Sequence, residues 1–427
     1  MNKLPNPLPK IFVELASYRD PQLPITIDDM LEKADHPEIF NFGICWQYDE
    51  TEDITRYDNK PNFRIRKHHY DESQGLGWAR AITNELYDGE ELILQLDSHH
   101  RFLKGWDTMM LEDFYQAKKF SNKPVLTTYL TPFEPQQEKY EECPCLMSQY
   151  EFSSDKLLMS RPYHIMDYKE RDCVIKARTI SGHFFLADGS FVKDVPYDPD
   201  IYFGGYTEET TLSVRAFTHG YDFYSPYRQY IWHEYTRNGR PKHWEDHGTE
   251  DSIGYIKTKK TSGERDIFAR NKTRQLFGQE EHGIDMGKYG LGNIRSLRDY
   301  EIYGGFDFKK CRIQDYTLQV KTPPNPTNWE EQFISHKYVI TCDWDLEFFK
   351  KHNFEKPKFM TFGLQNSSGA EVFRHDFTLE NGKEYVTLLH NQYVANFYSI
   401  DRPSKIVMYL FDEDKQWSER YEKNIIV

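Results

Sequence analysis

The chain has 427 residues, a formal net charge of -14 and 16% aromatic residues. This length predicts two or three domains, and the aromatic content supplies enough apolar area for their cores. The acidic charge argues against a nucleic-acid partner, and no apolar run reaches the roughly 18 residues that a membrane-spanning helix needs.

The chain starts with MNKLPNPLPK, which lacks the apolar core of a signal peptide. We expect residues 1–10 to form a flexible leader. The next segment alternates short apolar runs with amphipathic stretches, a pattern typical of parallel βαβ units. In chain order, we expect strands at 11–16, 39–46, 92–96 and 125–129, and helices at 26–34, 75–86, 106–120 and 208–218.

Residues 240–300 are charged and are expected to form loops and short helices. Beyond residue 310, short apolar runs recur between turn signals, which is typical of a β-sandwich. We therefore predict an α/β domain over 11–310 and an all-β sandwich over 311–427. The sandwich strands are expected at 316–320, 338–342, 359–364, 371–377, 385–390 and 405–411.

The six cysteines are sparse and follow no metal-binding or disulfide pattern. Reduced thiols in a cytoplasmic protein are the simplest explanation. The sequence therefore predicts a cytoplasmic location without a membrane span.

The strongest local pattern follows the strand at 92–96, where the chain continues with Asp97, Ser98 and His99. Open α/β sheets bind ligands at the carboxyl ends of their strands, and an Asp and a His two residues apart can converge on one cation. The alternative is an Asp that caps a turn beside a surface His. His233 also follows an apolar run and is a second candidate ligand.

Two further segments place functional groups at helix starts. Arg80 lies in the first turns of a helix that follows Gly75 and Gly77, where a phosphate could approach. Gly205 precedes the paired carboxylates Glu208 and Glu209, which could accept hydrogen bonds from sugar hydroxyls or could simply complement the helix dipole. The basic residues Arg215, Arg240 and Lys242 are additional candidates for phosphate contact, or for ion pairing at the surface.

Together these motifs resemble glycosyltransferase family 60, whose members have the GT-A fold. The resemblance rests on the order of five segments and covers roughly residues 10–300. These segments are 16–21 (ASYRDP), 75–80 (GLGWAR), 94–107 (LQLDSHHRFLKGWD), 208–222 (EETTLSVRAFTHGYD) and 233–244 (HEYTRNGRPKHW).

The resemblance implies a Rossmann-like mixed sheet with helices on both faces and a retaining transfer of sugar, most simply GlcNAc, from a UDP-sugar donor. It implies Mn²⁺ or Mg²⁺ held by Asp97, His99 and His233, with Glu208 and Glu209 in the catalytic region. It further implies that the donor contacts Ser17, Tyr18, Arg19, Asp20, Arg80, Asp97, Ser98 and Gly205.

The acceptor is expected to be a hydroxyl of a protein or a glycan. UDP-Gal and UDP-GalNAc remain alternative donors, and a non-catalytic carbohydrate-binding or assembly protein remains an alternative function. The sandwich could bind an acceptor glycan or a partner subunit through aromatic residues, could support an oligomer, or could only stabilise the catalytic domain. Its candidate aromatic residues are Tyr385, Tyr393, Phe397 and Tyr398.

Overall fold

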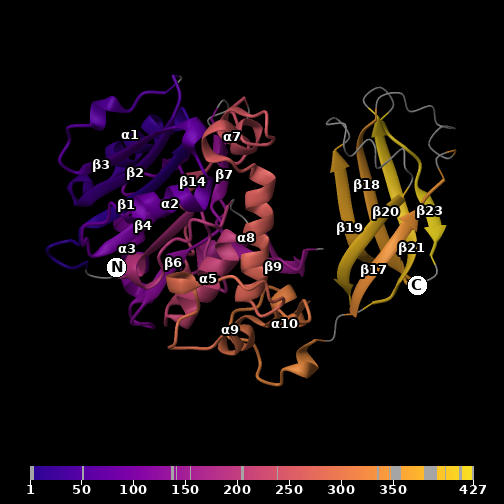
Figure 1. Cartoon of the computed structure of the whole chain (residues 1–427). Coiled ribbons are helices and arrows are strands. Elements are labelled where there is room, and N and C mark those ends of the chain that lie inside the picture. The colour runs from indigo at the N-terminus through magenta and orange to yellow at the C-terminus, as the bar shows by residue number, and fades with distance from the viewer. Residues whose placement is uncertain are drawn as a thin grey trace. The chain divides into compact units, whose positions relative to one another are not determined.

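The computed structural model divides the chain into two compact units, Met1–Thr327 and Asn328–Val427. It describes residues 4–50, 52–135, 139–140, 142–153, 155–202, 206–237, 239–333, 336–345, 347, 357–378, 392–399, 401–412 and 416–425. Figure 1 shows a mixed α/β architecture in the first unit and an all-β architecture in the second. Among the described residues, no helix has both the length and the apolar character that crossing a bilayer requires.

An eight-stranded mixed sheet forms the centre of the first unit. β1, β2, β3 and β4 run parallel to one another, whereas β12 is antiparallel to both of its neighbours, β4 and β6. This confirms the expected mixed sheet. In spatial order the strands are β11 (Ile175–Lys176), β13 (Asp222–Ser225), β6 (Pro124–Thr127), β12 (Phe184–Asp188), β4 (Leu92–Leu96), β1 (Ile11–Tyr18), β2 (Phe40–Tyr48) and β3 (Phe63–His69).

Helices cover both faces of this sheet. Since successive side chains of a strand point to opposite faces, each strand contributes to two different cores. In β1, Val13 packs with α1 (Gln22–Lys33) and α3 (Trp106–Ala117), while Phe12 packs with α5 (Glu208–Thr218) and α9 (Leu297–Gly304). α2 (Leu76–Asn84) packs on β1 and β2 through Ala79. The predicted helices therefore exist, with ends that differ by a few residues.

A smaller sheet lies next to the carboxyl end of β4. It consists of β5 (His100–Phe102), β14 (Ile231–His233), β7 (Thr131–Glu134) and β8 (Lys139–Tyr140). β14 runs antiparallel to β5, with His233 opposite His100. This pairing brings a residue far along the chain beside the turn that follows β4.

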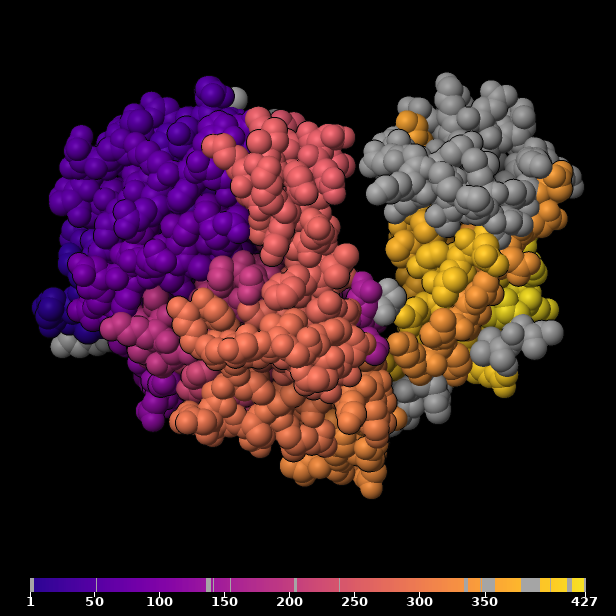
Figure 2. Space-filling model, in the orientation of Figure 1, coloured from indigo at the N-terminus to yellow at the C-terminus, as the bar shows by residue number. Residues whose placement is uncertain are grey.

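The charged region 240–300 contains a longer helix than the sequence predicted. α8 (Ser262–Leu276) begins with a capping box between Thr261 and Glu264, and it buries Ala269 and Leu276. In Figure 2, the salmon-coloured segment that contains α8 and α7 (Ile253–Thr258) stands on the surface of the first unit. The remaining short elements of this unit are β9 (Cys145–Phe152), β10 (Leu158–His164), α4 (Phe191–Asp194), α6 (His243–Asp246), β15 (Phe306–Asp307), β16 (Arg312–Ile313) and α10 (Asp315–Leu318).

Both ends of the predicted α/β domain differ in the structure. Leu4 and Leu8 pack against its core, so residues 4–10 belong to the folded unit rather than to a free leader. The unit also extends to Thr327, beyond the predicted boundary at 310, because Asn325 accepts a hydrogen bond from Arg178 at 2.7 Å. The segment expected to be a strand at 316–320 instead forms most of the helix α10 and the turn that follows it.

The second unit is a β-sandwich, as predicted. One sheet pairs β17 (His336–Asp343) with β20 (Gln392–Ser399). The other consists of β19 (Glu371–Thr378), β18 (Pro357–Asn366), β21 (Pro403–Asp412), β22 (Gln416–Trp417) and β23 (Tyr421–Asn424). The two sheets share one apolar core.

Two of the four predicted aromatic contacts, Tyr393 and Phe397, turn toward the core of the sandwich, whereas Tyr398 is half-buried. Phe397 is buried in the shared core, and Tyr393 packs against that core. Tyr385 and the strand expected at 385–390 lie outside the described residues.

Candidate functional site

A cavity of about 340 Å³ lies in the first unit, where the carboxyl ends of β1 and β4 meet β14. Parallel strands that run side by side end at the same edge of a sheet, and open α/β sheets bind ligands there. Tyr18 ends β1, Asp97 follows β4 and His233 ends β14, and all three residues line the cavity.

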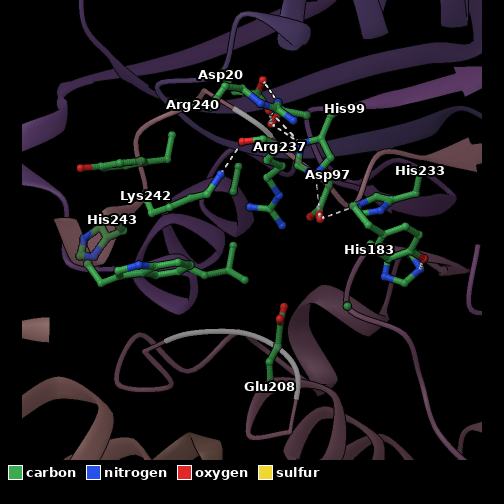
Figure 3. A pocket seen from close by; sticks show the side chains of 18 of the residues that line it. Asp20, Asp97, His99, His183, Glu208, His233, Arg237, Arg240, Lys242 and His243 are labelled. Carbon is green, nitrogen blue, oxygen red and sulfur yellow. Dashed lines mark hydrogen bonds and ion pairs between the residues drawn. The ribbon is translucent and has the colours of Figure 1, made fainter. Parts of the chain in front are cut away.

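Asp97, His99 and His233 form a three-residue cluster whose ligand atoms all lie within 4.8 Å of one another. The Asp97 Oδ2 atom lies 3.1 Å from His233 Nε2 and 3.7 Å from His99 Nε2. Figure 3 shows these side chains pointing toward one another at one wall of the cavity. One carboxylate and two imidazoles make a donor set that suits Mn²⁺ and similar divalent ions.

His99 is oriented by a second carboxylate behind the cluster. Its Nδ1 lies 2.8 Å from Asp20 Oδ2, and Asp20 also accepts a hydrogen bond from the Ser98 hydroxyl at 2.6 Å. Because a carboxylate only accepts, Nδ1 carries the proton and Nε2 presents its lone pair. The His99 Nε2 atom is buried and makes no hydrogen bond with the described residues, so it fits the role of a metal ligand.

Arg80 does not line the cavity, and its side chain is wholly buried. Its guanidinium donates to Asp97 Oδ1 at 2.8 Å and to the Leu96 carbonyl at 2.9 Å. Burial opposes ionisation of Asp97, but the hydrogen bond from His233 and the charge of Arg80 hold the pKa of Asp97 well below its ordinary value. The structure therefore places Arg80 behind Asp97 rather than at an exposed phosphate position.

Of the residues at and just after the end of β1, some line the cavity and others lie behind its wall. Tyr18 lines the cavity, and its hydroxyl donates to Asp246 Oδ2 at 2.6 Å. Ser17 is fully buried, and Arg19 pairs with Asp49 and Asp246 and does not line the cavity. Asp20 and Ser98 do line it, whereas Gly205 lies outside the described residues.

Three basic residues from the loop after β14 line the cavity: Arg237, Arg240 and Lys242. Arg240 is held by Asp20 and by Glu234, and Lys242 donates to the Arg237 carbonyl at 2.6 Å. The Arg237 side chain extends between Lys242 and Asp97 in Figure 3, and it has no ion pair with a carboxylate of the described chain. Arg215, in contrast, lies within α5 and donates to the Pro196 carbonyl at 2.7 Å.

Glu208 and Glu209 line another wall of the cavity. Glu208 accepts a hydrogen bond from the Tyr197 hydroxyl at 2.9 Å, and Glu209 accepts one from the Gly182 amide at 3.0 Å. Burial raises the pKa of Glu208 to about 7 and that of Glu209 to about 8. Both carboxyl groups can therefore exchange protons near neutral pH.

Arg237 and His183 belong to the cavity but were not identified as site residues from the sequence. The His183 ring lies 4.6 Å from the His233 ring, centroid to centroid, and its Nε2 accepts the Leu130 amide at 3.0 Å. Burial lowers the pKa of His183 to about 3, so its imidazole is neutral. No local pattern distinguishes His183, because the residue precedes an ordinary apolar strand. Arg237 lies inside the segment 233–244, where only its neighbours Arg240 and Lys242 were chosen.

The first unit contains the whole of a match to a known protein family. A family model described as Glycosyltransferase (GlcNAc) matches residues 10–59 and 55–310. No curated protein matches.

Two solved structures are similar to the chain at low sequence identity. TarS residues 1–349 from S. aureus, in complex with UDP-GlcNAc, is 17% identical, with coverage of 55% of this chain and 60% of that chain and a TM-score of 0.34. The chain thus spans less than two thirds of that structure. GalNAc-T7 with UDP, GalNAc and Mn²⁺ is 11% identical, with coverage of 97% and 69% and a TM-score of 0.45.

The family match covers more than half of the chain and includes every residue of the Asp97, His99 and His233 cluster. It also confirms the resemblance to glycosyltransferases drawn from the sequence motifs. The chain belongs to the Glycosyltransferase (GlcNAc) family.

Proposed function

We propose that the protein is a metal-dependent glycosyltransferase that transfers a sugar from a UDP-sugar to a hydroxyl group of a protein or glycan acceptor. The observation that carries this proposal is the cluster of Asp97, His99 and His233 in a cavity that also contains Arg237, which has no ion pair with a described carboxylate. A divalent cation and a positive side chain can both neutralise a diphosphate, and this wall offers a candidate cation site beside Arg237.

The arrangement of the cavity suits the three parts of a nucleotide sugar. Tyr18, His243 and Trp244 form an aromatic end, which suits the uracil base and the ribose. In Figure 3, His243, Glu208 and the cluster lie on three different sides of the cavity, and Arg237 points in next to the cluster. The diphosphate would lie against Arg237 and the cluster. Mn²⁺ or Mg²⁺ held by Asp97, His99 and His233 would neutralise negative charge on the departing diphosphate.

The sugar would then lie at the wall formed by Glu208, Glu209 and His183. The raised carboxyl pKa values allow these groups to accept or donate hydrogen bonds to hydroxyls. We propose transfer with retention: the bond between the anomeric carbon and the diphosphate oxygen breaks, and the acceptor oxygen bonds on the same face. The acceptor proton passes to the departing diphosphate, so the step requires no protein base.

The family description favours GlcNAc as the sugar, and UDP-Gal and UDP-GalNAc are the alternative donors. The decisive experiment measures free UDP after incubation of the full chain with each of these three donors and Mn²⁺. We expect release from one donor, abolished by EDTA and by Asp97→Ala. His36→Ala is the matched control, because His36 does not line the cavity.

If no donor is turned over, calorimetry with UDP and Mn²⁺ separates the remaining functions. Binding that is lost in Asp97→Ala would point to a non-catalytic binding protein or to a strict need for acceptor. Absence of UDP binding would overturn the proposed function.

A further inference from the structure

The outer face of the larger sheet of the sandwich combines small residues with aromatic side chains. Along β18, Met360, Phe362 and Leu364 enter the core, so Thr361 and Gly363 face outward. The register places Thr361 opposite Tyr409 of β21, and Gly363 opposite Arg374 of β19.

A hollow of about 390 Å³ lies on this face, lined in part by Thr361, Gly363, Tyr409 and Trp417. Gly363 forms part of its floor. A Cβ atom at Gly363 would come no closer than 3.4 Å to Glu371 Oε2, and the backbone there does not need glycine. The missing side chain therefore leaves open space in the hollow, and bulk added at this position would fill it.

One side of the hollow is aromatic. Trp417 is 54% exposed, and its ring lies 5.2 Å from the ring of Phe411, its cross-strand neighbour on β21, centroid to centroid. Tyr409 adds a second ring to the lining. An exposed tryptophan fixed against another ring offers a flat apolar surface with little rotamer entropy to lose on binding. The C–H faces of sugar rings pack on such surfaces.

The other side is polar and nearly neutral in charge. Gln365 Oε1 accepts a hydrogen bond from Arg420 at 2.9 Å, which leaves its amide NH₂ as a donor. Arg374 Nε lies 3.0 Å from Asp376 Oδ1, so part of its guanidinium fork stays available. Glu371 and Arg374 are the only charged residues among the described residues that line the hollow, and Arg374 also pairs with Asp376, so the hollow carries no net positive charge.

We propose that this hollow binds a neutral saccharide of one or a few rings. Its volume lies in the range of pockets for small ligands, whereas a stable protein interface needs about 800 Å² of surface on each partner. The lack of net positive charge disfavours phosphorylated or uronic-acid ligands. The aromatic platform with adjacent amide, hydroxyl and guanidinium groups matches the alternating apolar and hydroxyl surfaces of a sugar. This binding does not depend on the transferase activity proposed for the first unit.

The test is a neutral-glycan microarray with the full chain, followed by saturation-transfer NMR with the disaccharide that gives the strongest signal. We expect Trp417→Ala to weaken binding by at least about tenfold, the loss of one well-packed aromatic contact. Gly363→Val should weaken it comparably by filling the floor, and valine suits a strand, so this variant tests the site without removing a ring.

Two controls locate the binding. Phe120→Ala removes a ring that is 58% exposed on the first unit, and Asp97→Ala disables the other cavity. Both variants should bind the saccharide as the wild type does. Binding that survives in Trp417→Ala and Gly363→Val, binding lost in Asp97→Ala, or no neutral glycan bound on the array would each overturn the proposal.

Discussion

His99 donates from Nδ1 to the Asp20 carboxylate at 2.8 Å, which leaves its Nε2 lone pair facing Asp97. An asparagine at position 20 could donate to Nδ1 instead and shift the ring proton to Nε2, the proposed ligand atom. We therefore predict that Asp20→Asn lowers Mn²⁺ affinity by about 10–100-fold. Titration calorimetry with Mn²⁺ and UDP measures the change.

Asp107→Asn is the matched control, because the Asp107 carboxylate is also buried but accepts the backbone amides of Asp35 and His36. It should leave Mn²⁺ affinity unchanged. Equal affinities of wild type and Asp20→Asn would show that Asp20 does not set the tautomer of His99.

Arg80 is a wholly buried cation that lies 2.8 Å from Asp97 and 3.9 Å from Glu14. Its replacement by methionine would leave Asp97 without its closest positive partner, and loss of one member of a buried ion pair typically costs about 3–5 kcal/mol. We predict a fall of this size in the free energy of unfolding of Arg80→Met, measured in urea. Since Arg56 pairs with Asp28 at the surface, Arg56→Met should cost no more than about 1 kcal/mol. Similar costs for the two variants would contradict this prediction.

The fold was predictable where short segments carry their own signal. The apolar run of β4 followed by Asp97 identified a strand end, and the periodicity of α5 identified a helix that begins at Glu208. The antiparallel direction of β12 was not predictable, because its apolar run would suit a buried strand of either direction. Only its long-range pairing with β4 and β6 fixes that direction.

The sequence identified the residues of the Asp97, His99 and His233 cluster, but not their supporting contacts or the neighbouring His183. Asp97 and His99 lie close together in sequence, whereas His233 reaches them only because β14 pairs with β5. Arg80 was expected at a phosphate, but α2 places it in the interior behind Asp97. A sequence shows which residues are basic, but it does not show which carboxylate each basic residue pairs with in the fold. For the same reason, Arg237 could not be distinguished from its paired neighbours.

Arg237 projects into the cavity without an ion pair from the described carboxylates, so its removal should cost little stability. A charge-assisted hydrogen bond contributes about 1.5–3 kcal/mol, and we predict that Arg237→Ala weakens UDP binding by roughly 10–100-fold. Arg171→Ala, which removes a surface arginine paired with Asp167, is the matched control. Calorimetric titration of UDP in Mn²⁺ tests both variants, and an unchanged affinity in Arg237→Ala would exclude contact with the diphosphate.

Glu52 should make the stability of the protein depend on pH. Burial raises the pKa of Glu52 to about 8, and the Asp49 carboxylate adds to the shift, although a hydrogen bond from Trp46 at 3.0 Å opposes it. In the unfolded chain, Glu52 loses its proton near the ordinary glutamate pKa of 4.5, whereas the folded protein keeps it up to about pH 8. The folded state thus binds more protons in this window, and the Glu52 contribution to stability falls as the pH rises, with a slope of at most about 1.4 kcal/mol per pH unit.

Glu52→Gln keeps an oxygen that can accept from Trp46 but cannot ionise. We predict that the free energy of unfolding of this variant falls less steeply than that of the wild type between pH 5 and pH 8. Urea unfolding at several pH values gives both slopes, and Glu32→Gln, a substitution at an exposed position, should match the wild type. Parallel slopes in wild type and Glu52→Gln would mean that Glu52 is already ionised in the folded protein at pH 5, so that Arg19 and solvent outweigh its burial.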